Sequence, residues 1–394
     1  MEKNQQKTHL YSTLLFVFLF MVYIAICDSL KGVFIPVFKE SFHVQNTSMG
    51  FLLTASSLGY ILGTYVSGHL CELKGQKWIL ITGNIIIIAT MPLMVISQSY
   101  FSVLVGLFMM NIGIAFVGIG INTLIPLIMV SFQSVLMNFI HFAYGFGSMM
   151  TQMNAGLLLF KGVSWKTMYG ILGLVLLTLT LLFLPIKFPP LKAKLKTDVP
   201  RDKKQILKSK LTWFYIVCLG FYAAGEMGTG SWLINYLQEG YGFDAKISAF
   251  YSGLFYGGLM LGRLLGGYVT EKLGYFKTVT LSLGGIVCLY PIGILLGAKG
   301  PMIIAICGLF CSIVFPTLVL TIGTYFHEMS AYATGIIITT VSTIVLFCNM
   351  LVGYLNDQWG VKMSIIMMPI FFGISFITSM VLKKEVKKID GKQN

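Results

Sequence analysis

The chain has 394 residues, of which 56% are hydrophobic and 11% charged, and its mean hydropathy is +0.82. Soluble domains carry about 25% charged residues, so this composition argues against a soluble enzyme. A helix needs roughly 20 apolar residues to cross a bilayer, and twelve such helices would use about 240 residues and leave short loops. The composition therefore predicts a polytopic membrane protein.

The formal net charge of +14 does not indicate nucleic-acid binding, because the basic residues lie between apolar runs and form no stripe on a polar domain. The seven cysteines lie in or beside apolar runs without metal-ligand spacing, and we interpret them as packing residues. The first apolar run, from about Tyr11, is too long for a cleaved signal peptide and is expected to remain as the first helix. No metal or organic cofactor is predicted.

Twelve apolar runs follow one another along the chain and predict twelve membrane helices. Their ranges are 12–36, 48–70, 78–97, 101–130, 134–160, 167–188, 211–238, 247–270, 278–297, 300–323, 331–354 and 362–382. With a cytoplasmic N-terminus, the inside segments hold 20 of the 28 Lys and Arg residues, against six outside. We therefore expect both termini of this cell-membrane protein to be cytoplasmic.

A hydrophilic segment with nine cations, 187–210, divides the chain into halves of nearly equal length. We predict an N-terminal six-helix bundle over 1–188, a basic cytoplasmic linker over 189–210, a second bundle over 211–382 and a basic tail over 383–394. The linker is expected to be a solvated loop that attracts anionic lipid headgroups.

The two halves repeat one another in sequence. A shift of 199 residues superimposes Gly59 on Gly258, Gly63 on Gly262, Gly68 on Gly267, Glu72 on Glu271 and Gly75 on Gly274. Five matches at one offset, all in the second helix of each half and the loop after it, predict a duplicated six-helix unit.

The matched segments, GHLCELKGQK at 68–77 and GYVTEKLGYFK at 267–277, resemble the loop signature of the major facilitator superfamily. The resemblance implies an all-α fold of two pseudo-symmetric six-helix bundles, a monomer, and a charge latch at the cytoplasmic helix ends. Glutamate stands in both loops where aspartate is usual in the family. The candidate gating residues are Gly68, Glu72, Gly75, Arg263, Gly267, Glu271 and Gly274.

Of the fourteen acidic residues, only Asp28 and Glu226 fall well inside apolar runs, in the first and seventh predicted helices. An ionisable group at a helix centre costs roughly 2.5–3.5 kcal/mol on insertion scales and marks a functional site by default. The two positions differ by 198 residues, so both are expected to face a central cavity from equivalent helices. Asp28 and Glu226 are the leading candidates for proton coupling.

Lys31 follows Asp28 by three residues, which places both side chains on one helical face. Two interpretations stay open. The pair is either a buried ion pair that only neutralises itself, or a pair facing the cavity in which Lys31 tunes the proton affinity of Asp28 or contacts an anionic part of a solute.

The fifth apolar run carries Asn138, His141 and Gly145 on one helical face, at i, i+3 and i+7. A lone histidine is more often structural than a proton carrier. The companion amide makes a coupling role for His141 as credible as the structural one, and Asn138 becomes a candidate for solute binding.

The seventh run, FYAAGEMGTGSWLINYLQ at 221–238, has glycines on both sides of Glu226, which predicts a break in the helix where it lines a cavity. Aromatic rings and amides suit a polyhydroxylated ring, which offers C–H faces and hydroxyl groups. An aromatic belt at the membrane interface is the alternative for Tyr236 and, less so, for Trp232. The substrate-binding candidates are Lys31, Asn122, Asn138, Tyr222, Trp232, Asn235 and Tyr236.

Three further patches resemble one branch of the superfamily, the fucose-galactose-glucose proton symporters. They are MNFIHFAYGFG at 137–147, GFYAAGEMGTGSWL at 220–233 and FPTLVLTIG at 315–323. In that family an acid on helix 1 and another on helix 4 are implicated in proton coupling and sugar binding. Asp28 fits the first role, whereas neutral Asn122 stands where the second acid would fall.

These observations predict a secondary transporter that works by alternating access and imports a small polar solute, such as a sugar. The predicted coupling ion is the proton, with sodium as the alternative. The main alternative is a proton-coupled efflux antiporter for drugs or metabolites, which the 22 Met and 30 Phe residues would permit. An integral-membrane enzyme would need a cluster of acids, His or metal ligands near one interface, and the sequence shows none.

Overall fold

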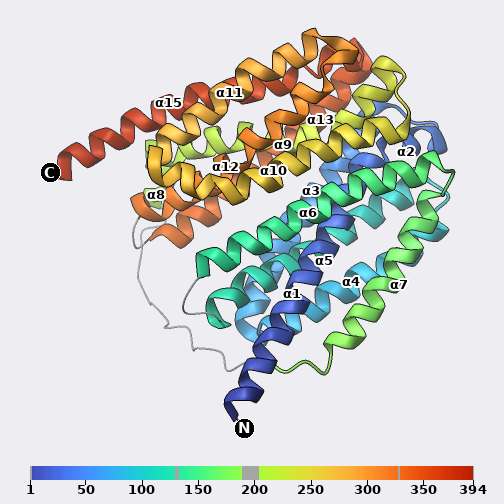
Figure 1. The fold of residues 1–394 in the computed structure, drawn as a ribbon, viewed down its shortest axis with the longest axis horizontal. Coiled ribbons are helices and arrows are strands. Elements are labelled where there is room, and N and C mark those ends of the chain that lie inside the picture. Colours follow the sequence, from blue (N-terminus) through green and yellow to red (C-terminus); the bar gives the residue numbers. More distant parts are fainter. Residues whose placement is uncertain (1, 129–132, 189–203, 327–328, 394) are drawn as a thin grey trace. The chain divides into compact units, whose positions relative to one another are not determined.

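The computed structural model describes residues 2–128, 133–188, 204–326 and 329–393, and every regular element in these ranges is helical (Figure 1). The helices are α1 (Glu2–Val33), α2 (Ile35–Phe42), α3 (Asn46–Lys74), α4 (Gln76–Ile96), α5 (Tyr100–Ile128), α6 (Gln133–Phe160), α7 (Trp165–Phe183), α8 (Lys204–Lys208), α9 (Lys210–Tyr241), α10 (Ala245–Leu273), α11 (Tyr275–Leu295), η1 (Gly297–Lys299), α12 (Pro301–Phe326), α13 (Ser330–Trp359), α14 (Val361–Ser364) and α15 (Met367–Gln393).

The twelve apolar runs correspond to the twelve long helices among these elements. Two ends differ from the prediction. The first run is divided after Val33, because Pro36 begins a new short helix, α2, in its first turn. The basic segment 383–394, predicted as a tail, is helical to Gln393 as the end of α15. Most of the predicted linker, 189–203, lies outside the described residues.

Nine helices in the described ranges are long and apolar enough to cross a membrane. The other three long helices, α6, α9 and α10, are interrupted by polar residues such as His141, Glu226 and Arg263. Polar side chains inside a membrane protein concentrate where function requires them. The less apolar helices are therefore the first place to look for a site.

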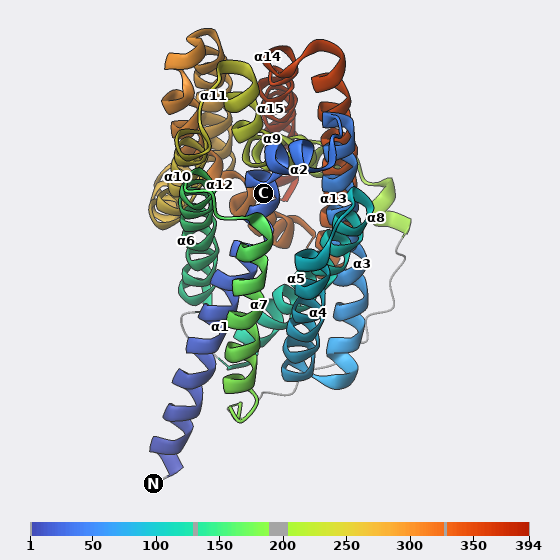
Figure 2. The same ribbon diagram turned by 90° about the vertical axis from the view of Figure 1, so that its right-hand side faces the viewer.

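The chain forms two compact units, Met1–Thr197 and Asp198–Asn394. Within the first unit, α1 packs on α6, α3 on α5, and α4 on both α5 and α7 (Figures 1 and 2). Within the second, α9 packs on α13, α10 on α12, and α11 on both α12 and α15. Each pair in one unit has its counterpart six membrane helices later, which confirms the predicted duplication.

Repeated glycines bring equivalent helices into contact. A Cβ built at Gly59 of α3 would lie 2.2 Å from the Phe108 carbonyl oxygen of α5. Its repeat, Gly258 of α10, would place a Cβ 2.8 Å from the Leu309 backbone nitrogen of α12. Small residues allow this backbone-to-backbone approach. The resulting van der Waals packing is one of the forces that associate helices inside a membrane. The glycine repeat is therefore a packing repeat in these helices.

Adding one methyl group at Gly59 tests this packing. The Gly59→Ala variant is expected to be destabilised by about 1–3 kcal/mol, because the backbone of Phe108 has to move away. Gly68→Ala, on the same helix, is the matched control, since a Cβ there meets nothing within 4 Å. Thermal unfolding of the detergent-solubilised protein measures both. Equal melting temperatures for the two variants would contradict the packing role of Gly59.

Candidate functional site

Asp28 on α1 lies in a three-residue group with Lys31 and Tyr144, which we call the Asp28 cluster. Lys31 Nζ lies 2.5 Å from Asp28 Oδ1, and the Tyr144 hydroxyl of α6 donates a hydrogen bond of 2.8 Å to Asp28 Oδ2. The side chains of Asp28 and Lys31 are 21% and 13% exposed. Both carboxylate oxygens therefore have protein donors, and the negative charge is balanced by a cation one helical turn away.

A glycine explains why Tyr144 reaches Asp28. A Cβ at Gly147, one turn after Tyr144, would lie 2.7 Å from the Val22 carbonyl oxygen of α1, so α6 approaches α1 closely there. The buried Gln152 amide adds a second link between these helices by donating to the Ser29 carbonyl oxygen at 3.3 Å. That Tyr144 is a hydrogen-bond donor to Asp28 could not be predicted from the sequence, because the contact joins helices far apart in the chain.

The structure places the other N-terminal candidates as follows. His141 is half-buried on α6, one turn before Tyr144. The Oδ1 atom of Asn122, on α5, is buried and has no hydrogen-bond partner among the described residues. Asn138 lies in α6, but its side chain is outside the described part of the structure. Asn122 is thus the candidate in this unit with a polar atom left for a bound solute.

Glu226 on α9 has partners on three helices, which we call the Glu226 cluster. Tyr222, one turn earlier and 1% exposed, makes a close hydrogen bond to Glu226 Oε2. The same hydroxyl lies 2.6 Å from the Cys311 carbonyl oxygen of α12. Arg263 of α10 interacts electrostatically with Glu226. The gating role predicted for Arg263 stays a prediction, and the structure adds that its positive charge acts on the buried acid.

The predicted break in the seventh membrane helix is wrong, because α9 runs unbroken from Lys210 to Tyr241. Its glycines serve close packing instead. A Cβ at Gly225 would meet the Phe372 ring at 2.8 Å, one at Gly228 the Met368 sulfur at 2.7 Å, and one at Gly230 the Tyr256 hydroxyl at 2.2 Å. Side chains of neighbouring helices occupy the space beside these glycines and pack against α9.

The remaining C-terminal candidates lie deep within the second unit. Trp232, Asn235 and Tyr236 are 1%, 0% and 2% exposed. The indole Nε1 of Trp232 has no hydrogen-bond partner in the described structure, whereas the Tyr236 hydroxyl lies 3.2 Å from that of Tyr241. Buried donors are nearly always paired in proteins, so the Trp232 indole N–H is a candidate contact for a bound solute.

The two repeated loops between the second and third membrane helices of each half have the same backbone form. Gly75 and Gly274 have φ angles of +85° and +82°, which favour glycine and turn the chain sharply between helices. Lys77, just after the first turn, donates to the Leu184 and Ile186 carbonyl oxygens at 2.8 and 2.9 Å, at the end of α7. Glycine at these two positions is explained by the turn itself.

Other members of the gating set have fewer contacts. A Cβ at Gly68 or Gly267 would meet nothing within 4 Å, so close helix approach within a unit does not account for them. Glu271 is exposed, and the side chain of Glu72 lies outside the described residues. A gating role for these four residues stays a prediction.

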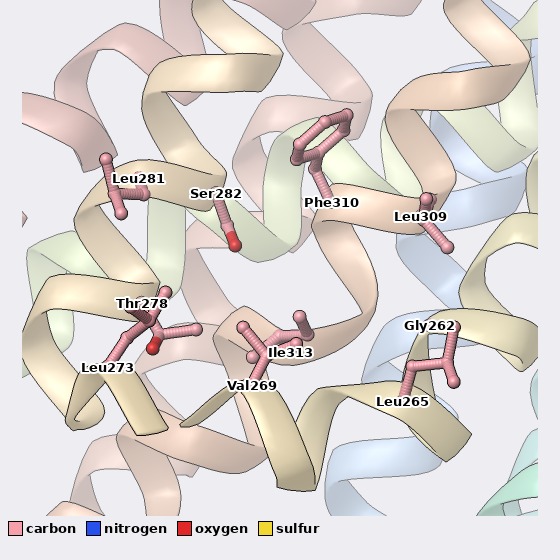
Figure 3. Close-up of a pocket in the computed structure, with 10 residues that line it drawn as sticks. All are labelled: Gly262, Leu265, Val269, Leu273, Thr278, Leu281, Ser282, Leu309, Phe310 and Ile313. Carbon is pink, nitrogen blue, oxygen red and sulfur yellow. The ribbon is translucent and has the colours of Figure 1, made fainter. Parts of the chain in front are cut away.

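A groove of about 280 Å³ lies between α10, α11 and α12 of the second unit (Figure 3). Its lining is apolar apart from the hydroxyl groups of Thr278 and Ser282, and it includes the exposed side chains of Leu265 and Leu281. None of the sequence-predicted binding residues lines it. Its surface suits lipid chains better than a polar solute.

Opposite charges and a tyrosine surround the acid in both units. Asp28 has Tyr144 and Lys31, and Glu226 has Tyr222 and Arg263. A carboxylate held in this way can take up a proton, and the neighbouring cation then becomes available to another acceptor. The geometry can therefore link the binding of a proton to the binding of a hydrogen-bonding solute.

The loss of one charge tests the Asp28–Lys31 pair. Lys31→Met and Asp28→Asn are each expected to lower the melting temperature, because each leaves one charge unpaired. The loss should stay below the about 3–5 kcal/mol of a fully buried pair, since both side chains are partly exposed. The double variant is expected to lose less stability than either single one. A double variant as unstable as the sum of both would contradict direct pairing.

Comparison with known sequences identifies a family. The sequence profile of the Major Facilitator Superfamily matches residues 15–342. A Helicobacter pylori protein named as a glucose/galactose transporter is 27% identical, over 41% of this chain and 39% of its own length. An uncharacterised transporter of this type from Bacillus subtilis is 24% identical over 62% of this chain and 63% of its length. The chain therefore matches between about two fifths and two thirds of the length of these relatives.

Solved structures share the fold at low identity. The Escherichia coli fucose:proton symporter FucP has a TM-score of 0.67 and 18% identity, over 95% of this chain and 99% of that one. A bacterial homologue of the lysosomal transporter Spinster, in an inward-facing form, has a TM-score of 0.79 and 15% identity, over 95% and 98%. At these identities the likeness concerns the fold.

Proposed function

This chain belongs to the Major Facilitator Superfamily and is a multi-pass membrane transporter rather than an enzyme, and from that premise we propose that it imports a small sugar together with protons. The observation that carries the proposal is the pair of equivalent acids, Asp28 and Glu226, each bonded to a tyrosine and balanced by a cation. We also propose cytoplasmic termini, in line with the excess of basic residues in the inside segments.

Proton coupling follows from competition for the cation. While Asp28 is ionised, Lys31 is paired with it, and the positive charge of Arg263 favours the ionised form of Glu226. Protonation removes the negative charge, and the N–H donors of the cation can then turn to hydroxyl oxygens of a solute. Proton and solute therefore favour one another's binding, and the favourable coupling is reciprocal by linkage.

Each unit, taken by itself, has a buried polar atom that suits a sugar hydroxyl group. In the first unit, the Asn122 Oδ1 atom can accept a hydrogen bond from a hydroxyl group. In the second unit, the Trp232 indole N–H can donate a hydrogen bond to a hydroxyl oxygen. Relatives named for glucose and galactose transport and for fucose:proton symport support this class of solute.

Ligand-induced thermal stabilisation tests the proposal, because a ligand that binds only the folded protein raises its melting temperature. We expect fucose, galactose or glucose to stabilise the detergent-solubilised protein, and more strongly at pH 6 than at pH 8, since protonation favours sugar binding. Asp28→Asn or Glu226→Gln is expected to abolish the pH dependence of the stabilisation. Organic acids and lipophilic cations should have no effect.

The control for these variants is Glu40→Gln, which removes an exposed carboxylate near the end of α2. It is expected to behave as the unmodified protein at both pH values. Stabilisation by lipophilic cations, with all sugars silent, would refute sugar import and favour drug efflux. Equal stabilisation by sugars at both pH values would contradict proton coupling. It would indicate instead a uniporter, which transports sugar without a coupling ion.

A further inference from the structure

The hydrogen bonds of Tyr222 need more protons than its hydroxyl supplies. The hydroxyl oxygen lies within hydrogen-bond distance of Glu226 Oε2 and of the Cys311 carbonyl oxygen, 2.6 Å away. A carbonyl oxygen only accepts, and a phenol carries one proton. If Tyr222 donates to Cys311, the bond to Glu226 requires a proton on the carboxyl group. The full arrangement is therefore satisfied when Glu226 is protonated.

From this geometry we propose that Tyr222 is a positioning residue that transmits the protonation state of Glu226 to helix α12. With Glu226 protonated, its O–H donates to the Tyr222 oxygen, and Tyr222 donates to the Cys311 carbonyl, which ties α9 to α12. With Glu226 ionised, the Tyr222 O–H donates its hydrogen bond to the carboxylate, and the Cys311 carbonyl oxygen loses this donor. The proposal rests on Glu226 being a titrating group of the proposed proton-coupled cycle.

The hydrogen bond from Tyr222 reaches α12 next to a position where this helix lacks a backbone hydrogen bond. Pro316 lies inside this helix and has no N–H group, so the Ser312 carbonyl oxygen lacks the amide donor that the regular helix would supply. Helices bend most readily at such positions. Cys311 directly precedes Ser312, so the hydrogen bond from Tyr222 attaches beside the place where α12 can change its bend. A change at Glu226 can thereby alter the shape of α12.

Groups from three helices act on Glu226. On its own helix Tyr222 donates to it, from α10 Arg263 acts on it with a positive charge, and from α12 the Cys311 thiol lies within its electrostatic reach. Near this level, Phe372 of α15 packs against Gly225, and the Tyr290 hydroxyl of α11 lies 3.0 Å from Thr229 Oγ1 of α9. Arg263 is therefore the cation that favours the ionised state.

Backbone hydrogen exchange of α12 in the full-length protein in detergent, without any solute, measures the proposed link. After correction for the intrinsic pH dependence of exchange, amides around Pro316 are expected to be about fivefold better protected at pH 6 than at pH 8, the effect of one hydrogen bond of ordinary net strength. Tyr222→Phe keeps the ring and is expected to remove this difference. Glu226→Gln can donate to Tyr222 at any pH and is expected to keep α12 protected throughout.

The matched control is Tyr215→Phe, because Tyr215 also joins α9 to α12, through a 2.8 Å hydrogen bond to Thr321 Oγ1, and no acid among the described residues interacts with it. It is expected to preserve the pH dependence. An unchanged pH dependence in Tyr222→Phe would overturn the proposal, as would a pH-dependent α12 in Glu226→Gln. Failure of sugar import alone would leave the exchange result intact, since no sugar is used.

Discussion

The central constraint on this protein is the presence of two carboxylates within helices that cross a membrane. An isolated charge there is costly, and each unit relieves the cost with a tyrosine hydroxyl and a nearby cation. Much of the surrounding architecture serves this purpose. Glycines such as Gly147 bring neighbouring helices close enough for the tyrosine to reach, and the long helix α9 stays regular because other side chains fill its glycine notches.

The two units meet the same constraint with different connections. Asp28 finds its cation on its own helix, three residues away, and its tyrosine on α6. Glu226 finds its tyrosine on its own helix and its cation on α10, and that tyrosine also reaches α12. A change of protonation at Glu226 can therefore affect three helices. The two acids thus lie in equivalent helices but have different neighbours.

The main features of the fold could be predicted from the sequence, because apolar runs separated by charged loops leave few alternatives in a membrane. The glycine repeat also revealed the duplication. The acids Asp28 and Glu226 could be identified because a carboxylate in an apolar run is conspicuous, and Lys31 because helical spacing places it beside Asp28. These inferences depend on local composition and on periodicity along one helix.

Contacts between helices could not be read in this way. Tyr144 is 116 residues from Asp28, and Cys311 is 89 residues from Tyr222, so no spacing rule links them. The glycines around Glu226 suggested a broken helix, since the sequence does not show that Phe372 and Met368 pack against them. The influence of Arg263 on Glu226 was not visible in the sequence either, because it depends on the packing of α10 against α9.

The central claim is that a buried acid couples proton uptake to solute import. Its most direct test is to add sugar to proteoliposomes that contain the purified protein and a pH-sensitive dye, without an imposed pH gradient. The account predicts that the interior becomes acidic as the sugar enters, and that Glu226→Gln abolishes the acidification. Sugar uptake without any change of internal pH would contradict it.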